Sequence, residues 1–229
     1  MSGVRIPALV WQKVDLAFPV TGTKIPADHG YSLYSAICRL IPSLHGGPTA
    51  QSSRADQLWP SVGIHPIYAR PCGACMLELQ RFSKLRIRID TDNIETLLPL
   101  VGAELALDGA AVRLGSPTVE MLRPSTRVRS RIVVIKGFVE AEPFLGAVSR
   151  QLQTLEIAGR PGIPFRKEAP LPGSNKSPLI RRTLRIRDKV VVGFCVAVEE
   201  LTAEESIRLQ EAGIGGRRRF GCGLFLPSE

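Results

Sequence analysis

Five glycines near the C-terminus enclose three consecutive arginines in the stretch AGIGGRRRFGCGLFLP. Glycine has no side chain, so a phosphate can approach its main-chain N–H closely, and an arginine guanidinium pairs with two phosphate oxygens at once. The stretch lacks the Gly-Lys-Ser/Thr of a nucleotide-binding loop. We therefore expect it to contact a nucleic-acid backbone. The residues concerned are Gly213, Gly215, Gly216, Arg217, Arg218, Arg219, Gly221 and Gly223.

A structural alternative is open for part of this stretch. Glycine often ends a helix because it tolerates the left-handed conformation, and this accounts for Gly213 and Gly215. A triple arginine is also common on a solvated surface. Neither explanation accounts for the second Gly-x-Gly, which follows the arginines.

The chain has only three histidines, His29, His45 and His65. Histidine can act as acid or base at neutral pH because its ordinary pKa is about 6.5. His29 and His45 stand at opposite ends of the first predicted helix, roughly 20 Å apart, so we do not expect them to act as a pair. Each has a structural alternative: a surface position for His45, a ring bonded to backbone for His29, and packing in a strand for His65.

Cys72 and Cys75 form a single Cys-x-x-Cys in RPCGACML. A structural zinc site needs four ligands, usually as a second such pair or a histidine pair, and none has the spacing. We expect free thiols, no metal and no other cofactor. A thiol- or metal-dependent hydrolase built around this pair is an alternative. The odd total of five cysteines indicates a reducing compartment.

Composition indicates a globular protein with an anionic partner. The 229 residues are 44% hydrophobic, the net charge is +9 and the pI is about 9.8. A pI above about 9 is typical of nucleic-acid-binding proteins, with a membrane surface as the other polyanion. No stretch reaches the roughly 20 apolar residues of a membrane span, and charged residues interrupt the N-terminus. We expect no membrane partner and a cytoplasmic location.

The first half of the chain predicts a ferredoxin-like unit. Strands are expected at 13–20, 61–69, 74–81, 83–90 and 110–122 from alternating or continuous apolar residues. Helices are expected from an N-cap at Asp28 to Gly46, and over 93–107 with a kink at Pro99. The order strand, helix, strand, strand, helix, strand is that of the ferredoxin-like fold.

The second half predicts a similar order without sequence identity to the first. Strands are expected at 130–139, 180–186, 190–198 and 222–227, with helices at 142–157 and 202–213. Thr202 and Glu205 form a capping box at the second helix. The fold class is therefore α+β, with tandem ferredoxin-like units over residues 1–125 and 126–229.

Three segments resemble a known family. The spacing Gly-hydrophobic-Gly, five residues, Gly-hydrophobic-Gly is similar to the signature of the repeat-associated RNA-binding (RAMP) superfamily. Within it, PADHGYSLYSAICRLIPSLHG, GIHPI and GRRRFGCGLFLP resemble the CRISPR repeat-RNA processing endoribonucleases of Myxococcus-type type I systems. The resemblance implies metal-free cleavage of CRISPR precursor RNA within each repeat. It also implies that the guide RNA stays bound or joins other subunits of an effector complex.

The resemblance also implies candidate catalytic residues. The family's acid–base histidine lies in a similar Leu-His context, which points to His45, with His29 as second choice. Family members often carry a tyrosine on the first helix. The matching position here is Cys38, so Tyr34, one turn earlier on the same face, is the candidate. Metal-free cleavage uses the ribose 2′-OH as nucleophile and leaves a 2′,3′-cyclic phosphate and a 5′-hydroxyl.

Basic residues on two predicted strands complete the expected RNA surface. Lys84, Arg86 and Arg88 share one face of 83–90, while Arg182 and Arg185 lie on the later hairpin. A solvated sheet face is the alternative for each set. Aromatic residues make up only 6%, so we expect recognition of an RNA hairpin by backbone and shape rather than by base stacking. A non-catalytic RNA-binding subunit of an effector complex is the alternative function.

Overall fold

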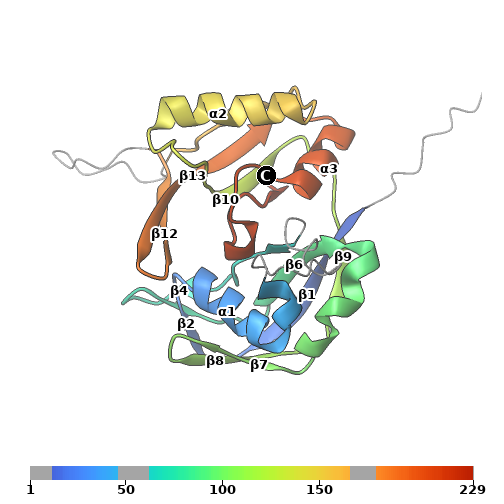
Figure 1. Ribbon diagram of the computed structural model, residues 1–229, viewed down its shortest axis with the longest axis vertical. Coiled ribbons are helices and arrows are strands. Elements are labelled where there is room, and N and C mark those ends of the chain that lie inside the picture. Colours follow the sequence, from blue (N-terminus) through green and yellow to red (C-terminus); the bar gives the residue numbers. More distant parts are fainter. Residues whose placement is uncertain (1–11, 46–61, 166–178, 229) are drawn as a thin grey trace, which may run out of the picture.

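The computed structural model describes residues 12–45, 62–165 and 179–228. In Figure 1 most of them lie around two larger antiparallel sheets, one above the other. The chain passes from the lower sheet to the upper one between residues 122 and 127. The division into 1–125 and 126–229 falls in this segment and stays a prediction. Among the described residues, no helix has the length and apolar character needed to cross a membrane.

The lower sheet is built around β1 (Lys13–Thr21). In the order β3-β6-β1-β8-β7, its strands are β3 (Gly63–Ile64), β6 (Lys84–Asp90), β8 (Ala110–Leu114) and β7 (Glu104–Leu107), and β9 (Thr118–Met121) also pairs with β1. Leu16 lies opposite Ile87 and both are buried, as the alternation of apolar residues along the two strands predicts. The predicted strands at 13–20 and 83–90 are confirmed.

Helix α1 (Gly30–Leu40) and the following 3₁₀-helix η1 (Pro42–His45) cover the lower sheet. Leu33, Ile37 and Leu44 are buried in the core that includes β1, so the predicted apolar stripe is largely confirmed. The expected N-cap is wrong by one residue, because the cap position is His29. The Asp28 carboxylate instead accepts a hydrogen bond (2.8 Å) from the main-chain N–H of Arg185 in the upper sheet.

The predicted second helix, 93–107, is wrong in type and extent. Residues Thr91–Leu100 form a 3₁₀-helix, η3, and the chain then enters β7 and β8. Pro99 lies inside η3 and has no N–H to donate, which disfavours a continuous α-helix. The strand predicted at 110–122 is also two strands, β8 and β9.

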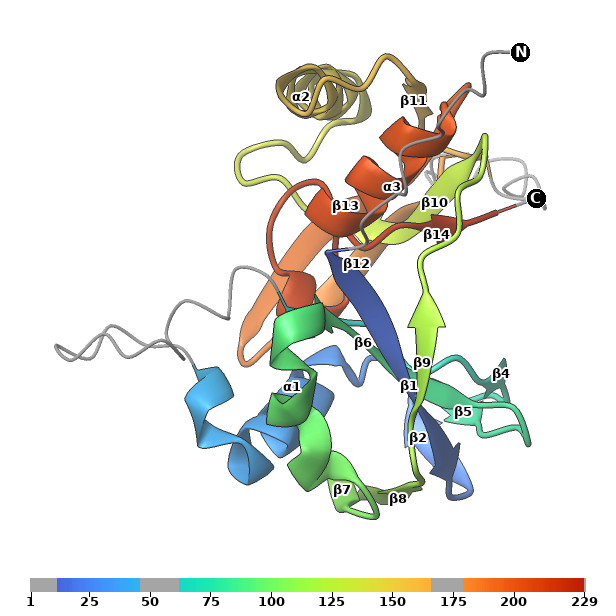
Figure 2. The same cartoon turned by 90° about the vertical axis from the view of Figure 1, so that its right-hand side faces the viewer.

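The strands predicted at 61–69 and 74–81 are too long, because only β3 forms in the described part of the first and only a short strand of a small three-stranded sheet forms in the second. This small sheet contains β2 (Lys24–Pro26), β5 (Met76–Glu78) and β4 (Arg70–Pro71), and in Figure 2 it lies on the other side of β1 from α1. Pro66 has no N–H for a strand ladder, which accounts for the short β3.

The upper sheet has the order β11-β13-β10-β14, and β12 pairs with β13. Its strands are β10 (Val128–Val133), β11 (Arg160–Gly162), β12 (Arg181–Ile186), β13 (Lys189–Glu199) and β14 (Leu226–Pro227). Helices α2 (Ala141–Thr154) and α3 (Ala203–Ala212) enclose a core that includes Phe144, Phe194 and Leu209. Thr202 and Glu205 form the predicted capping box at α3.

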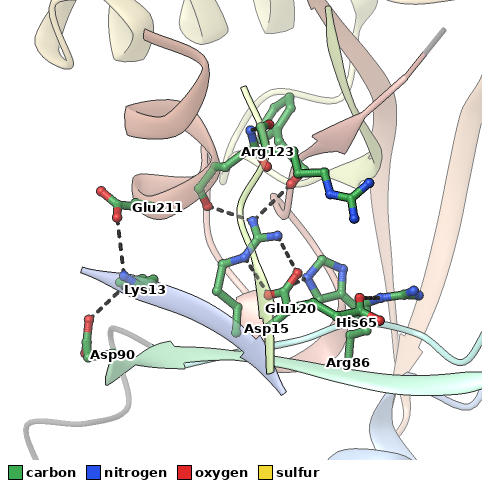
Figure 3. Close-up of polar contacts among 11 residues, drawn as sticks. Lys13, Asp15, His65, Arg86, Asp90, Glu120, Arg123 and Glu211 are labelled. Carbon is green, nitrogen blue, oxygen red and sulfur yellow. Dashed lines mark hydrogen bonds and ion pairs between the residues drawn. The ribbon is translucent and has the colours of Figure 1, made fainter. Parts of the chain in front are cut away.

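A buried arginine of the lower sheet, Arg88, is hydrogen-bonded to both parts of the molecule. Arg88 of β6 donates two hydrogen bonds (2.8 Å each) to the Asp15 carboxylate, and its Nη1 donates to the carbonyls of Gln210 (2.7 Å) and Phe225 (3.0 Å). Figure 3 shows Asp15 facing His65 in this network, with Glu211 beside Lys13. Only 1% of Arg88 is exposed, so the prediction that it faces an RNA groove is corrected: it fastens α3 and the C-terminal segment to the lower sheet.

Candidate active site and nucleic-acid interface

The glycine-rich loop begins where α3 ends at Gly213 and continues through the 3₁₀-helix η4 (Arg218–Phe220). The main-chain N–H groups of its five glycines are already used inside the protein. Gly215 donates to Gln151 Oε1 (2.8 Å), Gly216 to the Val134 carbonyl (3.0 Å) and Gly223 to the Ile132 carbonyl (2.8 Å). Gly213 and Gly221 donate to the carbonyls of Leu209 and Arg218. The expectation that these N–H groups receive a phosphate is therefore corrected.

Close backbone packing explains two of the glycines. Gly215 has φ +73°, and a Cβ there would lie 2.4 Å from the Val134 carbonyl oxygen. Gly223 has φ +69°, and a Cβ would lie 2.1 Å from the Ile214 oxygen. A side chain would prevent the loop from packing on β10 and on itself. Gly216 is exposed, and a Cβ there would meet nothing within 4 Å.

The three arginines of the loop have different surroundings. Arg217 is exposed, and its backbone has the left-handed conformation (φ 66°). Arg218 is half-buried, and burial lowers its pKa. Arg219 lies with its Cζ 5.3 Å from the ring centre of Tyr34 and 5.2 Å from that of Phe220, which is a cation–π geometry. Because the glycine N–H groups are occupied, the arginines stay the predicted phosphate contacts of this loop.

Helix α1 meets η4 in an aromatic cluster. The rings of Tyr34 and Phe220 meet edge to face with centres 4.9 Å apart, and those of Tyr31 and Phe220 are 6.1 Å apart. Arg187, in the turn between β12 and β13, donates from Nε to the Tyr31 hydroxyl (3.0 Å). The sequence had not indicated Arg187, because it is 156 residues from Tyr31 along the chain.

Contacts continue along α1 toward His45. Burial raises the pKa of Tyr34 to about 12, and its neighbour Cys38, one turn later, also has a pKa raised by burial. Nearby Arg219 opposes both shifts. The Cys38 thiol donates to the carbonyl of Leu44 (3.6 Å), the residue before His45. The backbone of His45 closes η1, and its side chain lies outside the described part of the structure.

His29 has the structural role that was its alternative. Its Nε2 accepts the main-chain N–H of Ile67 (2.9 Å), so Nδ1 carries the proton and donates to the Pro26 carbonyl (2.7 Å). The ring is buried, and burial lowers its pKa. Neither nitrogen is available to a substrate, so we remove His29 from the candidate catalytic residues.

His65 is also a buried residue rather than a surface acid or base. Its Nε2 lies 3.8 Å from Asp15 Oδ1, beside the Asp15–Arg88 pair. Burial lowers the pKa of His65 to about 3, although Asp15 opposes the shift. The ring is therefore neutral at physiological pH, and the expected packing role is confirmed.

The remaining basic candidates do not form one groove. Glu120 of β9 accepts from Lys84 Nζ (2.8 Å) and Arg86 Nε (2.7 Å), so both cations are already paired. Arg182 and Arg185 are three positions apart on β12, and their side chains project from opposite faces of the strand. Arg182 is half-buried and Arg185 is exposed.

The Cys-x-x-Cys pair lies at the exposed turn between β4 and β5. Both thiols are free and exposed. Across the described residues, no group of three or more His, Cys, Asp or Glu side chains is placed to hold a metal ion.

Comparison with known proteins places this chain in a family. The Cas6 CRISPR family model matches residues 14–229. A CRISPR-associated endonuclease Cas6 of Myxococcus xanthus (strain DK1622) is 37% identical over 214 residues, covering 93% of this chain and 81% of that protein.

Solved structures agree in fold. A CRISPR associated protein Cas6 superposes with a TM-score of 0.60 at 13% identity, covering 95% of this chain and 99% of that one. An RAMP protein binding different RNA substrates superposes with a TM-score of 0.61 at 14% identity, covering 95% of this chain and 99% of that one. These likenesses confirm the ferredoxin-like α+β fold class. The match over nearly the whole sequence, together with the 37% identical relative, shows that this chain belongs to the Cas6 family.

Proposed function

We propose that the protein is a metal-independent endoribonuclease that cleaves CRISPR precursor RNA within its repeats to release guide RNAs. The 37% identical relative is named an endonuclease, and the net charge of +9 suits an RNA partner. The observation that carries the proposal is the position of Arg219. It lies over Tyr34 on the helix that leads, through Cys38 and Leu44, to His45.

The reaction requires a base, an acid and a cation. The base removes the proton of the ribose 2′-OH, and the 2′ oxygen attacks the adjacent phosphorus. The bond from phosphorus to the 5′ oxygen then breaks, and the acid protonates that oxygen. A cation stabilises the extra negative charge on the phosphorane. The products are a 2′,3′-cyclic phosphate and a 5′-hydroxyl, and the reaction needs neither metal nor cofactor.

We assign His45 to proton transfer and Arg219 to the phosphorane charge. An arginine held by two rings loses little freedom when it binds phosphate. Tyr34 has a pKa near 12 and stays neutral, so it positions a phosphate oxygen by donating a hydrogen bond and is no base. His29 has no role in this reaction.

The test is cleavage of a labelled cognate repeat RNA in EDTA by the wild type, His45→Ala and Ser43→Ala. Ser43 is exposed on the same 3₁₀-helix and controls for damage to that segment. General acid–base catalysis is worth about 10²–10⁴-fold, so His45→Ala should lose that factor while keeping RNA affinity. The product ends are checked for a cyclic phosphate.

Three results would contradict the proposal. Cleavage that stops in EDTA would refute the metal-free mechanism. Full activity of His45→Ala would refute the role of His45 in proton transfer. Tight binding without cleavage by the wild type would favour the RNA-binding subunit of an effector complex. Retention of the product by the enzyme, or its transfer to such subunits, is part of the same proposal and is measured by gel filtration after cleavage.

A further inference from the structure

Three arginines gather on the face of the upper sheet that is turned away from α2 and α3. Val128, Val196 and Val198 belong to the core beneath those helices. Arg129 and Arg131 alternate with buried residues of β10, and Arg129 Nε donates to the Cys195 thiol (3.0 Å). Arg182 of β12 lies opposite Gly193, two residues before Cys195, so it projects from the same face.

The charge of this trio is not balanced inside the protein. Within the described ranges, none of Arg129, Arg131 and Arg182 has an ion pair with a carboxylate, and Arg182 Nε is buried without a hydrogen-bond partner. Burial lowers the pKa of Arg182, and Arg131 and Arg129 lower it further. Like charges held together without a counterion are unfavourable, and a bound anion would relieve their repulsion.

One exposed aromatic ring, Tyr68, lies beside the trio, and a second, Phe82, lies on the turn next to the backbone of Tyr68. Tyr68 is 68% exposed and close enough to Arg182 to affect its pKa. Ser83 Oγ donates to the Tyr68 carbonyl (2.7 Å), which holds the backbone of Tyr68 beside the turn that carries Phe82. Phe82 is 75% exposed, and Arg81 lies over its ring at 4.7 Å. Exposed rings beside cations suit nucleobases, which stack on them while the phosphates meet the arginines.

The trio lies beside the glycine-rich loop, because the carbonyl of Ile132, the residue after Arg131, accepts the N–H of Gly223 (2.8 Å). Burial raises the pKa of Cys222 to about 12, and Arg131 and Arg217 both lie near enough to oppose that shift. An RNA strand on the trio would therefore reach the loop that carries Arg219.

We propose that Arg129, Arg131 and Arg182, with Tyr68 and Phe82, form an RNA subsite that holds unpaired nucleotides. We call these five residues the strand subsite. The inference rests on the proposed function, since it takes the same RNA. Unpaired nucleotides fit because bases in a duplex stack on each other, whereas single strands can lay their bases on aromatic rings. This proposal departs from the expectation from composition that base stacking plays no part, because Tyr68 and Phe82 are exposed aromatic rings with arginines near them.

The experiment measures affinity for the cognate repeat RNA, made uncleavable by a 2′-deoxy nucleotide at the cleavage position, by fluorescence anisotropy. Tyr68→Leu is compared with Tyr68→Phe, which keeps a ring. Arg182→Gln is compared with Arg113→Gln, an exposed arginine of β8 that carries the same charge loss away from the subsite. Folding of every variant is checked by urea denaturation.

Tyr68→Leu should weaken binding roughly 5- to 150-fold and Tyr68→Phe about twofold or less. Arg182→Gln should lower the slope of log affinity against log salt by about 0.7, while Arg113→Gln leaves it unchanged. An abasic nucleotide placed at each unpaired position in turn should identify one position whose loss weakens the wild type but not Tyr68→Leu.

If Tyr68→Leu and Arg182→Gln bind as tightly as the wild type, the subsite is overturned. The nuclease proposal still stands in that case, provided that the wild type cleaves the unmodified repeat. An equal loss of affinity for a blunt, fully paired RNA would overturn the assignment to unpaired nucleotides. Failure of the wild type both to bind and to cleave its repeat would instead overturn the proposed function.

Discussion

Gly215→Ala and Gly216→Ala form a neighbouring pair with opposite expected outcomes. The backbone of Gly215 has the left-handed conformation, and the added methyl group would lie 2.4 Å from the Val134 carbonyl oxygen. At Gly216 the φ is not left-handed and the methyl group meets nothing. Both variants keep every arginine of the loop, so they separate the packing role of the glycines from any role in RNA approach.

The magnitude follows from what the loop loses. A left-handed alanine costs about 1–2 kcal/mol. Moving the segment off β10 also breaks the Gly215–Gln151 and Gly216–Val134 hydrogen bonds, each worth about 0.5–1.5 kcal/mol. The free energy of unfolding should therefore fall by roughly 2–5 kcal/mol in Gly215→Ala, and Tm by roughly 5–15 °C. Gly216→Ala should stay within about 0.5 kcal/mol of the wild type.

Urea denaturation followed by circular dichroism measures both values, and RNA affinity is measured on the folded proteins. Gly216→Ala should bind RNA as the wild type does, because its N–H already donates to Val134. A Gly215→Ala protein as stable as the wild type would refute the packing argument. A tenfold loss of RNA affinity in Gly216→Ala, without loss of stability, would restore the phosphate role of the glycine backbone.

Three further predictions concern buried groups. Arg88→Leu should cost roughly 3–5 kcal/mol in urea denaturation, because it leaves the Asp15 carboxylate buried without its partner; a cost below about 1 kcal/mol would contradict this. The free energy of unfolding should fall as pH drops from about 6.5 toward about 3, by up to about 1.4 kcal/mol per pH unit. In this range His65 binds a proton in the unfolded chain but stays neutral in the folded protein. His65→Gln should flatten this dependence, and the lowered pKa of Asp15 should add a further loss only below 3.8. Tyr34→Phe keeps the ring against Phe220 but removes the hydroxyl, so cleavage should fall roughly 10- to 100-fold with RNA affinity unchanged; full activity would exclude the hydroxyl from the reaction.

Features that depend on neighbouring residues could be predicted from the sequence. The capping box of Thr202 and Glu205 is made within one turn, and the alternation in β6 reflects the two faces of a strand. Gly213 ends α3, as its type indicates. The 3₁₀-helix at 91–100 was missed because helix spacing of apolar residues is similar for the two helix types over so short a segment.

The candidate site could be predicted only in outline. The glycine-rich spacing and the Leu-His context led to the right family and to the region around α1. They could not assign Arg88, His29 or Arg182, because the strand pattern shows which face a side chain takes but not what covers that face.

The sequence by itself determined the α+β class, the excess of positive charge and the residue types available for acid–base and phosphate chemistry, because composition and local periodicity carry that information. Only the tertiary structure decided which of those residues are available. Arg88 meets partners 73 to 137 positions away, and Arg187 meets Tyr31 at 156. Burial and hydrogen-bond partners arise from such distant contacts, and they decide whether an arginine holds the fold together or remains open to RNA.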